Sequence, residues 1–152
     1  MRFKTGIHLS CLLYMISCSM PAARKQAGPN ILGTWRLFSG TVITKGVSVV
    51  TDYTKGQRMI KIVNASHFAF LKHNLHPAKD SPNHFDAGGG LYTLNGDRYT
   101  EHLDYYTDKN WENKTFNFRV SVIGDTLIQQ GTEKIAAEGI ERVIIEKYVA
   151  VK

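Results

Sequence analysis

Short runs of alternating apolar and polar residues fill the chain from residue 31 onward, and this pattern constrains the fold more than any other feature. Turn residues interrupt the runs about every eight to twelve positions. Such alternation is typical of half-buried strands, and no comparable stretch has a helical period. The pattern predicts strands at 34–39, 42–53, 58–63, 67–72, 91–94, 98–106, 115–123, 126–131 and 140–151.

Most of the connections between these strands are short. Asn95-Gly96 is the strongest hairpin signal, because Asn-Gly accepts the positive φ that tight turns need. Strands joined so closely are antiparallel neighbours, and about eight of them lose their exposed edges by closing into a barrel. The sequence therefore predicts an all-β fold, a single antiparallel barrel of about eight strands. The alternative is a mixed α+β fold with a helical turn within 42–50 or 134–138.

The first 18 of the 152 residues have the pattern of an export signal. Arg2 and Lys4 precede a mostly apolar stretch at 7–16, which is too short to span a bilayer. The segment ends in Met15-Ile16-Ser17-Cys18, which resembles a bacterial lipobox. That resemblance implies that Cys18 becomes the first mature residue and carries lipid.

The expected organisation follows from this N-terminus. Residues 19–29 are small, polar and basic and predict a flexible tether, and 30–152 form the barrel domain. We expect a protein exported to the bacterial cell envelope and held at the membrane by lipid on Cys18. The alternative is plain secretion after cleavage behind Ser19.

Charge and cysteine content exclude several classes of protein. There are 19 basic and 13 acidic residues, and without Arg2 and Lys4 the formal charge falls from +6 to +4 (17 against 13). The bases are scattered, whereas nucleic-acid binding needs a clustered basic face, so we expect no nucleic-acid partner. The cysteines, Cys11 and Cys18, both lie in the export segment, which excludes a disulfide framework.

Several short motifs resemble those of lipocalin-like proteins. Gly33-Thr34-Trp35 matches the Gly-x-Trp that opens the first strand in that superfamily. The resemblance implies that Trp35 closes the barrel bottom near a basic residue of the last strand, either Arg142 or Lys147. Further patches resemble small lipocalin-like bacterial lipoproteins of uncharacterised function, namely Ser66-His67-Phe68, Gly89–Leu94, Tyr99-Thr100-Glu101 and Glu146-Lys147-Tyr148.

Polar residues that share a face with apolar ones are the candidates for a ligand site. Alternation places Glu101 with Tyr99 and Leu103, facing the barrel interior, where an unpaired carboxylate would be costly. Arg119 would suit a carboxylate on the ligand. The predicted pocket lining is His67, Tyr92, Tyr99, Glu101, Arg119 and Glu146. The alternative is a filled core in which Glu101, Arg119 and Glu146 satisfy one another.

The expected function is therefore binding of a small amphipathic or hydrophobic molecule at the cell envelope, with no cofactor. An isomerase or hydratase using Glu101 and His67 as an acid–base pair is a weaker alternative. Another is a surface interaction module built on 74–86 with Tyr105, Tyr106 and Trp111. The spacing of His73, His76 and His84 fits no metal template, so we expect no metal site. For Gly88-Gly89-Gly90 we expect a bulge or a close backbone approach.

Overall fold

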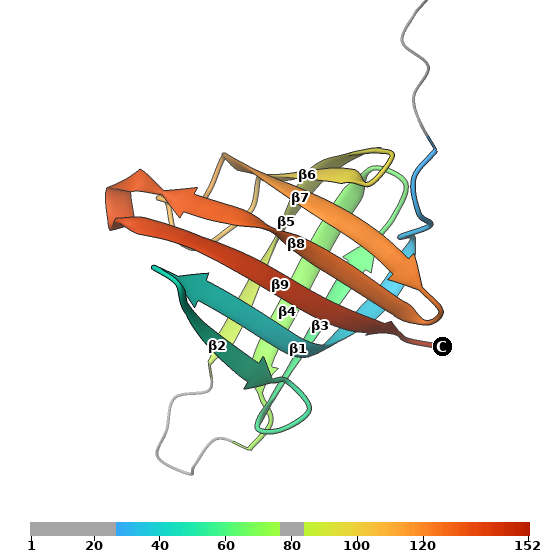
Figure 1. The fold of residues 1–152 in the computed structure, drawn as a ribbon, viewed down its shortest axis with the longest axis horizontal. Coiled ribbons are helices and arrows are strands. Elements are labelled where there is room, and N and C mark those ends of the chain that lie inside the picture. The colour runs from blue at the N-terminus through green and yellow to red at the C-terminus, as the bar shows by residue number, and fades with distance from the viewer. Residues whose placement is uncertain (1–26, 77–83) are drawn as a thin grey trace, which may run out of the picture.

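The computed structural model describes residues 27–76 and 84–152 of the chain, which form nine strands and one short 3-10 helix (Figure 1). The export segment and Cys18 lie outside the described residues. In the described part of the chain, no helix is long and apolar enough to cross a membrane. The elements are β1 (Gly33–Thr44), β2 (Val47–Asp52), β3 (Gln57–Val63), β4 (His67–Asn74), β5 (Phe85–Asn95), β6 (Arg98–Leu103), β7 (Lys114–Ile123), β8 (Thr126–Ile135), η1 (Ala136–Glu138) and β9 (Ile140–Ala150).

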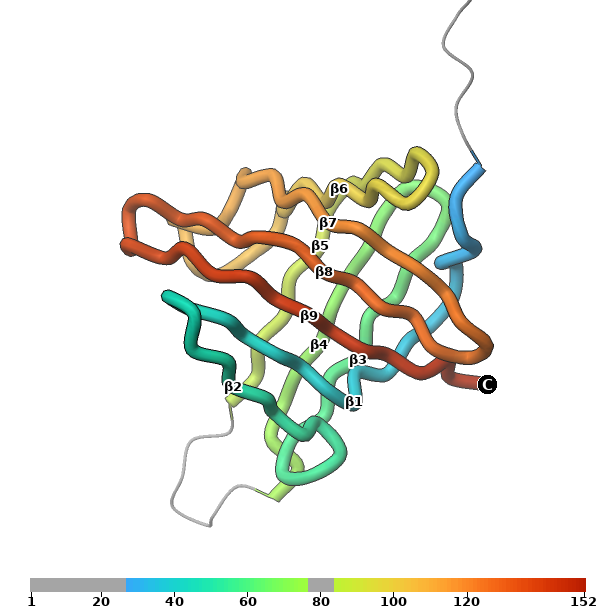
Figure 2. Tube along the Cα trace, in the orientation of Figure 1, coloured from blue at the N-terminus to red at the C-terminus, as the bar shows by residue number. Residues whose placement is uncertain are grey.

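The strands form one antiparallel sheet that closes on itself. β3 to β9 pair in chain order, and β9 returns to pair with β1 along 35–43 (Figure 2). The other edge of β1 pairs with β3 at 33–36 and with β2 at 39–44. A register shift between Leu37 and Ser39 marks the change of partner. The predicted all-β barrel is confirmed: eight strands close it, and β2 is an additional outer strand.

Most strand positions were predicted correctly. The expected strand at 42–53 is the end of β1 and all of β2, joined by a turn, so the helical alternative fails there. The second alternative is partly correct, because η1 forms a single 3-10 turn within 134–138. Gly96 has φ +59°, which agrees with the predicted Asn-Gly hairpin between β5 and β6.

The glycine run lies inside a strand. β5 starts at Phe85, six residues earlier than predicted, so Gly88-Gly89-Gly90 sits within it. A Cβ atom on Gly90 would lie 2.0 Å from the carbonyl oxygen of His102 in β6. The run therefore permits a close approach between neighbouring backbones, which is one of the two predicted roles.

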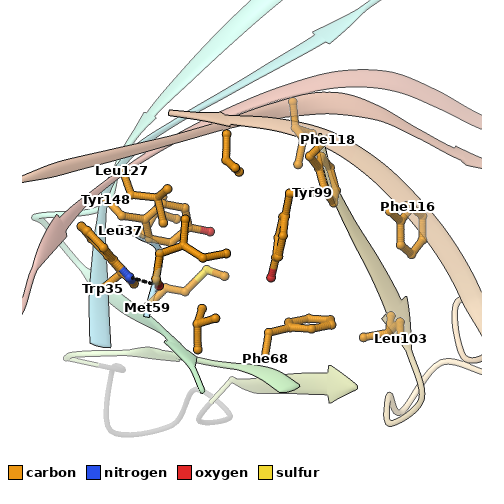
Figure 3. Packing of buried hydrophobic residues seen from close by; sticks show 14 of the residues in the cluster. Trp35, Leu37, Met59, Phe68, Tyr99, Leu103, Phe116, Phe118, Leu127 and Tyr148 are labelled. Atoms are coloured by element: carbon orange, nitrogen blue, oxygen red, sulfur yellow. Dashed lines mark hydrogen bonds between the residues drawn. The ribbon is translucent and has the colours of Figure 1, made fainter. Parts of the chain in front are cut away.

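Several of the most completely buried side chains lie at the end of the barrel where β1 starts and β9 finishes, which we call the Trp35 end. The indole Nε1 of Trp35 donates a hydrogen bond to the carbonyl oxygen of Ile31, at 2.8 Å. Ile31 is itself buried, so the segment before β1 covers this end. Figure 3 shows the labelled core side chains pointing into the interior, with Trp35, Leu37, Leu127 and Tyr148 gathered together and Leu103 and Phe116 away from them.

Candidate functional site

A cavity of about 330 Å³ occupies the half of the barrel away from the Trp35 end. Strand alternation turns two kinds of side chain into it. Phe70, Phe116 and Phe118 supply apolar walls, and Met59 and Ile144 complete them. Charged and amide groups share the same interior face, and they are Lys61, Lys72, Asp86, Glu101, Gln129, Glu133, Arg142 and Glu146. An apolar chamber with a few convergent polar groups is the usual form of a small-ligand site.

Trp111, in the connection between β6 and β7, forms one side of the cavity at its outer end. Its ring lies 6.3 Å from that of Tyr106 and 5.7 Å from that of Phe116, centroid to centroid. The Arg142 guanidinium lies 5.5 Å from the Trp111 ring, in a cation–π contact. Trp111 Nε1 also donates to Glu138 Oε2 at 2.9 Å, which ties this connection to η1. The side chain is therefore held from both sides.

An ion pair lies at the inner end of the cavity. Lys61 Nζ is 2.7 Å from Glu101 Oε1 and 2.8 Å from Gln129 Oε1, and it donates a hydrogen bond to each. The Lys61 side chain is only 3% exposed and that of Glu101 9%. These three residues come from β3, β6 and β8, so the interaction spans the barrel. Burial of both charges is tolerated because each has a partner at hydrogen-bond distance.

Aromatic rings enclose the Lys61 ammonium. It lies 5.6, 5.8 and 5.5 Å from the ring centroids of Phe68, Tyr99 and Tyr148, distances at which ring faces attract a cation. Burial raises the pKa of the Tyr99 hydroxyl, and the Glu101 charge adds to the effect. No hydrogen-bond partner meets that hydroxyl among the residues the structure describes. The interior therefore has three aromatic walls around one ammonium.

Glu146, on β9, is the second carboxylate near the inner end. Its Oε2 accepts a hydrogen bond of 2.6 Å from the Tyr148 hydroxyl. Burial raises the pKa of Glu146, while the Lys61 charge and the Tyr148 hydrogen bond oppose that rise. When a carboxyl group has a higher pKa in the folded state than in the unfolded state, the folded protein loses stability as pH rises and the group ionises. Ionisation of Glu146 therefore lowers the stability of the folded barrel.

Two further ion pairs lie nearer the outer end. Lys72 Nζ is 3.1 Å from Asp86 Oδ2, and Arg142 Nε is 2.6 Å from Glu133 Oε2. Each pair joins neighbouring strands, β4 with β5 and β8 with β9. Together with Lys61 and Glu101, they match every cavity cation to a carboxylate. Glu146 is then the one charged group of the lining with no ionic contact within 4 Å among the described residues.

The structure brings together part of the predicted pocket. Glu101 and Glu146 line the cavity, and Tyr99 is buried beside them. Tyr92 packs on Tyr99 at 5.3 Å between ring centroids and donates from its hydroxyl to the carbonyl oxygen of Asn64. Tyr92 is half-buried and does not line the cavity. That Glu101 and Glu146 bind a ligand stays a prediction.

Two predicted lining residues point away from the interior. His67 is exposed and contacts the Ser66 hydroxyl through Nδ1. Arg119 is exposed and pairs with Asp97. Their neighbours Phe68 and Phe118 are buried, and alternation then turns His67 and Arg119 to the opposite face. The pocket assignment was wrong for both, and so was the filled core that relied on Arg119.

The expected partner of Trp35 was also wrong. Arg142 lies at the far end of β9, over Trp111, and Lys147 is exposed. Trp35 instead pairs with Ala150 across the β1–β9 contact and bonds to Ile31. Trp35 is buried near one end of the barrel, and its indole contacts a backbone carbonyl rather than a basic side chain.

Sequence reasoning missed Lys61 and Gln129. The signal was present for both: Lys61 alternates with Met59 and Val63, and Gln129 follows Leu127 on the same face. When the residues two positions before and after a lysine on a strand are apolar and buried, the lysine shares their face and points into the barrel. Glu101 was correctly expected to need a partner, and Lys61 is that partner.

The alternatives gain little from the geometry. His67 lies outside the barrel wall and Glu101 inside it, so they do not form an acid–base pair. Tyr106 and Trp111 belong to the cavity lining, which leaves Phe85 and Tyr105 as exposed aromatics in the described part of the expected surface module. Part of the 74–86 segment lies outside the described residues. In 27–76 and 84–152 no group of three or more His, Cys, Asp or Glu residues is arranged to hold a metal.

Comparison with solved structures shows a likeness to a bacterial barrel protein. The chain is similar to the crystal structure of a lipocalin-like protein from Bacteroides uniformis ATCC 8492, with 19% identity and a TM-score of 0.49. The match covers 79% of this chain and 97% of that one. No family model and no curated protein matches the chain. The chain's own strand order and β1–β9 closure are those of an up-and-down barrel of lipocalin type, so the expected lipocalin-like fold is confirmed.

Proposed function

We propose that this protein binds one small amphipathic molecule inside its barrel. The observation that carries the proposal is the cavity of about 330 Å³, with an aromatic wall along its length and a polar cluster at its inner end. That volume lies at the lower end of the range for ligand sites, roughly 300–1,000 Å³. An amphipathic molecule matches both parts, because its apolar body would contact Phe70, Phe116 and Phe118 and its polar group would reach Gln129 and Glu146.

The polar residues themselves support this function over a purely structural core. A charged group within an apolar barrel costs desolvation energy, and apolar side chains of similar volume are often as stable or more so. Among the described residues no cation lies within 4 Å of Glu146, so the more distant Lys61 charge offsets that cost only in part. Sites that bind ligands commonly retain such costly groups, because stability and function make different demands.

The test is native mass spectrometry of residues 19–152 purified from the host without denaturant. We expect a reproducible adduct, because an enclosed site of this kind buries most of the surface of a small ligand. Adding a host metabolite extract should also raise the melting temperature of the protein, since a ligand that binds the folded state stabilises it. A clean apo mass with no thermal shift in any extract fraction would contradict the proposal.

A matched pair of variants localises the ligand. Ile144→Trp places an indole in the cavity, because Ile144 is buried and lines it. Val143→Trp adds the same group on the outside, where Val143 is 37% exposed. We expect Ile144→Trp to lose the adduct and Val143→Trp to keep it, with both proteins showing native far-ultraviolet circular dichroism. Equal retention by the two variants would place the ligand elsewhere.

We also propose that the chain is exported and anchored to the cell envelope by lipid on Cys18. The support is the sequence of residues 1–18, with its positive start, short apolar stretch and lipobox-like end. Cys18→Ser is expected to abolish palmitate labelling in host cells and to move the protein from the membrane to the soluble fraction. Cys11→Ser is the control and should leave both unchanged. Palmitate uptake by Cys18→Ser protein would exclude this anchor.

A further inference from the structure

The charges of the cavity lining are unequal in number, and this bears on the ligand. The lining has three cations, Lys61, Lys72 and Arg142. Each of them contacts its own carboxylate at 2.6–3.1 Å, and these carboxylates are Glu101, Asp86 and Glu133. Glu146 is a fourth carboxylate, and it accepts a hydrogen bond from the Tyr148 hydroxyl. The lining therefore has one negative charge in excess when Glu146 is ionised.

We infer that the ligand is an organic monocation, an ammonium group on an aromatic or aliphatic body, whose ammonium binds Glu146. This inference rests on the proposed function and names the ligand class for that site. Gln129 faces Glu146 in the β8–β9 register, so its side chain lies on the same inner face. The ammonium would be a counter-ion for Glu146 and would restore charge balance in the cavity.

Anionic ligands fit the same lining poorly. A carboxylate ligand needs an unpaired cation, and Lys61 already donates to both Glu101 and Gln129. Arg119, the residue expected from the sequence to bind a ligand carboxylate, is outside the barrel and paired with Asp97. A fatty-acid headgroup at the inner end would also meet the negative charge of Glu146. The distribution of charge therefore discriminates against acids.

The aromatic walls favour a cation as well. Phe70, Tyr106, Trp111 and Phe116 line the cavity, and ring faces attract organic cations. The structure already contains an example of this environment, because the Lys61 ammonium lies within 6 Å of the centroids of three aromatic rings. An alkyl- or arylammonium ion in the adjoining cavity would meet similar surroundings.

Three probes of similar size and different charge test the inference: 2-phenylethylamine, 2-phenylethanol and 3-phenylpropionate. Binding is measured by isothermal titration calorimetry at pH 7.5 with residues 19–152, freed of any retained adduct. We expect the amine to bind about tenfold more tightly than the alcohol, and the acid more weakly than either. Glu146→Gln should cut affinity for the amine by about tenfold and leave that for the alcohol nearly unchanged.

Glu141→Gln is the matched control, since Glu141 lies on the same strand but is exposed and pairs with Lys134. It should keep the preference for the amine. Alcohol binding by Glu146→Gln serves as the check that this variant retains a folded cavity. If the three probes bind equally, or the acid binds best, the ligand is not a cation and the binding function stands.

The pH dependence of amine binding gives a second readout. The ammonium needs the ionised form of Glu146, whose pKa is raised above 4.5 by burial. Amine affinity should therefore fall as pH drops through that raised value, and Glu146→Gln should lose this dependence. Other charged or titratable groups near Glu146 affect the same titration. They are Lys61, Tyr99, Glu101 and Glu133 on other strands, Tyr53 after β2, and Arg142 and Tyr148 on β9 itself. The alcohol should show little of this dependence.

The molecule retained from the host separates the two proposals. A retained adduct that carries an amine or another cationic group supports the inference, and a neutral or acidic adduct overturns it while confirming a ligand. Absence of any adduct, together with no binding of the three probes, overturns the proposed function and this inference with it.

Discussion

Replacing Lys61 with methionine is expected to lower the free energy of unfolding by about 3–5 kcal/mol, the usual cost of removing one partner from a buried ion pair. Lys61 is 3% exposed and provides the cation for Glu101 at 2.7 Å. Methionine keeps most of the volume but leaves Glu101 buried without its counter-ion. The Lys61 charge also holds down the pKa of Glu146, so the deficit should grow as pH rises and Glu146 ionises.

Equilibrium unfolding in urea measures the loss, and two further variants interpret it. Lys61→Met/Glu101→Leu removes both charges, and we expect a stability within about 1 kcal/mol of the wild type or above it. Lys134→Met breaks an ion pair in which both side chains are more than 60% exposed, so its cost should be below about 1 kcal/mol. A Lys61→Met protein as stable as Lys134→Met would show that the interior ion pair contributes little.

The barrel could be predicted from sequence because its signals are local. Alternation with period two marks a strand, and Asn95-Gly96 marks its hairpin, without knowledge of distant partners. The change of partner of β1 from β3 to β2 occurs near a register shift between Leu37 and Ser39 in the β1–β9 pairing, and no composition rule shows either feature. The glycines before Leu91 hid the start of β5, because glycine is usually read as a strand end rather than as a close contact with β6.

The site could be predicted only in part, for a physical reason. Alternation within one strand assigns faces correctly, and it placed Glu101 and Glu146 inside. Which side chains then meet depends on pairing between strands 40 and 68 residues apart, as with Lys61, Glu101 and Gln129. Arg119 was assigned to the pocket because its side chain suits a ligand carboxylate. The alternation of its own strand indicates the opposite face, because Phe116 and Phe118 turn inward. The face periodicity was the better guide.

Trp35 offers the second large effect, at the end of the barrel opposite the cavity. Trp35→Ala is expected to cost about 3–5 kcal/mol, because it removes a large side chain that is 6% exposed. The void left by the missing indole is only part of this cost in stability. Trp35 Nε1 holds the carbonyl oxygen of Ile31, and Ile31 is 3% exposed, so the segment covering this end loses both its hydrogen bond and its packing surface.

Trp35→Phe separates the two contributions. It keeps an aromatic ring in the core but leaves the Ile31 carbonyl without its donor, and the expected cost is about 1–3 kcal/mol. Lys147→Ala is the control for the basic residue first expected beside Trp35; since Lys147 is exposed, the change should stay within about 0.5 kcal/mol. Unfolding in urea ranks the three. A loss for Lys147→Ala as large as that for Trp35→Ala would mean that a basic side chain, and not the Ile31 carbonyl, closes this end.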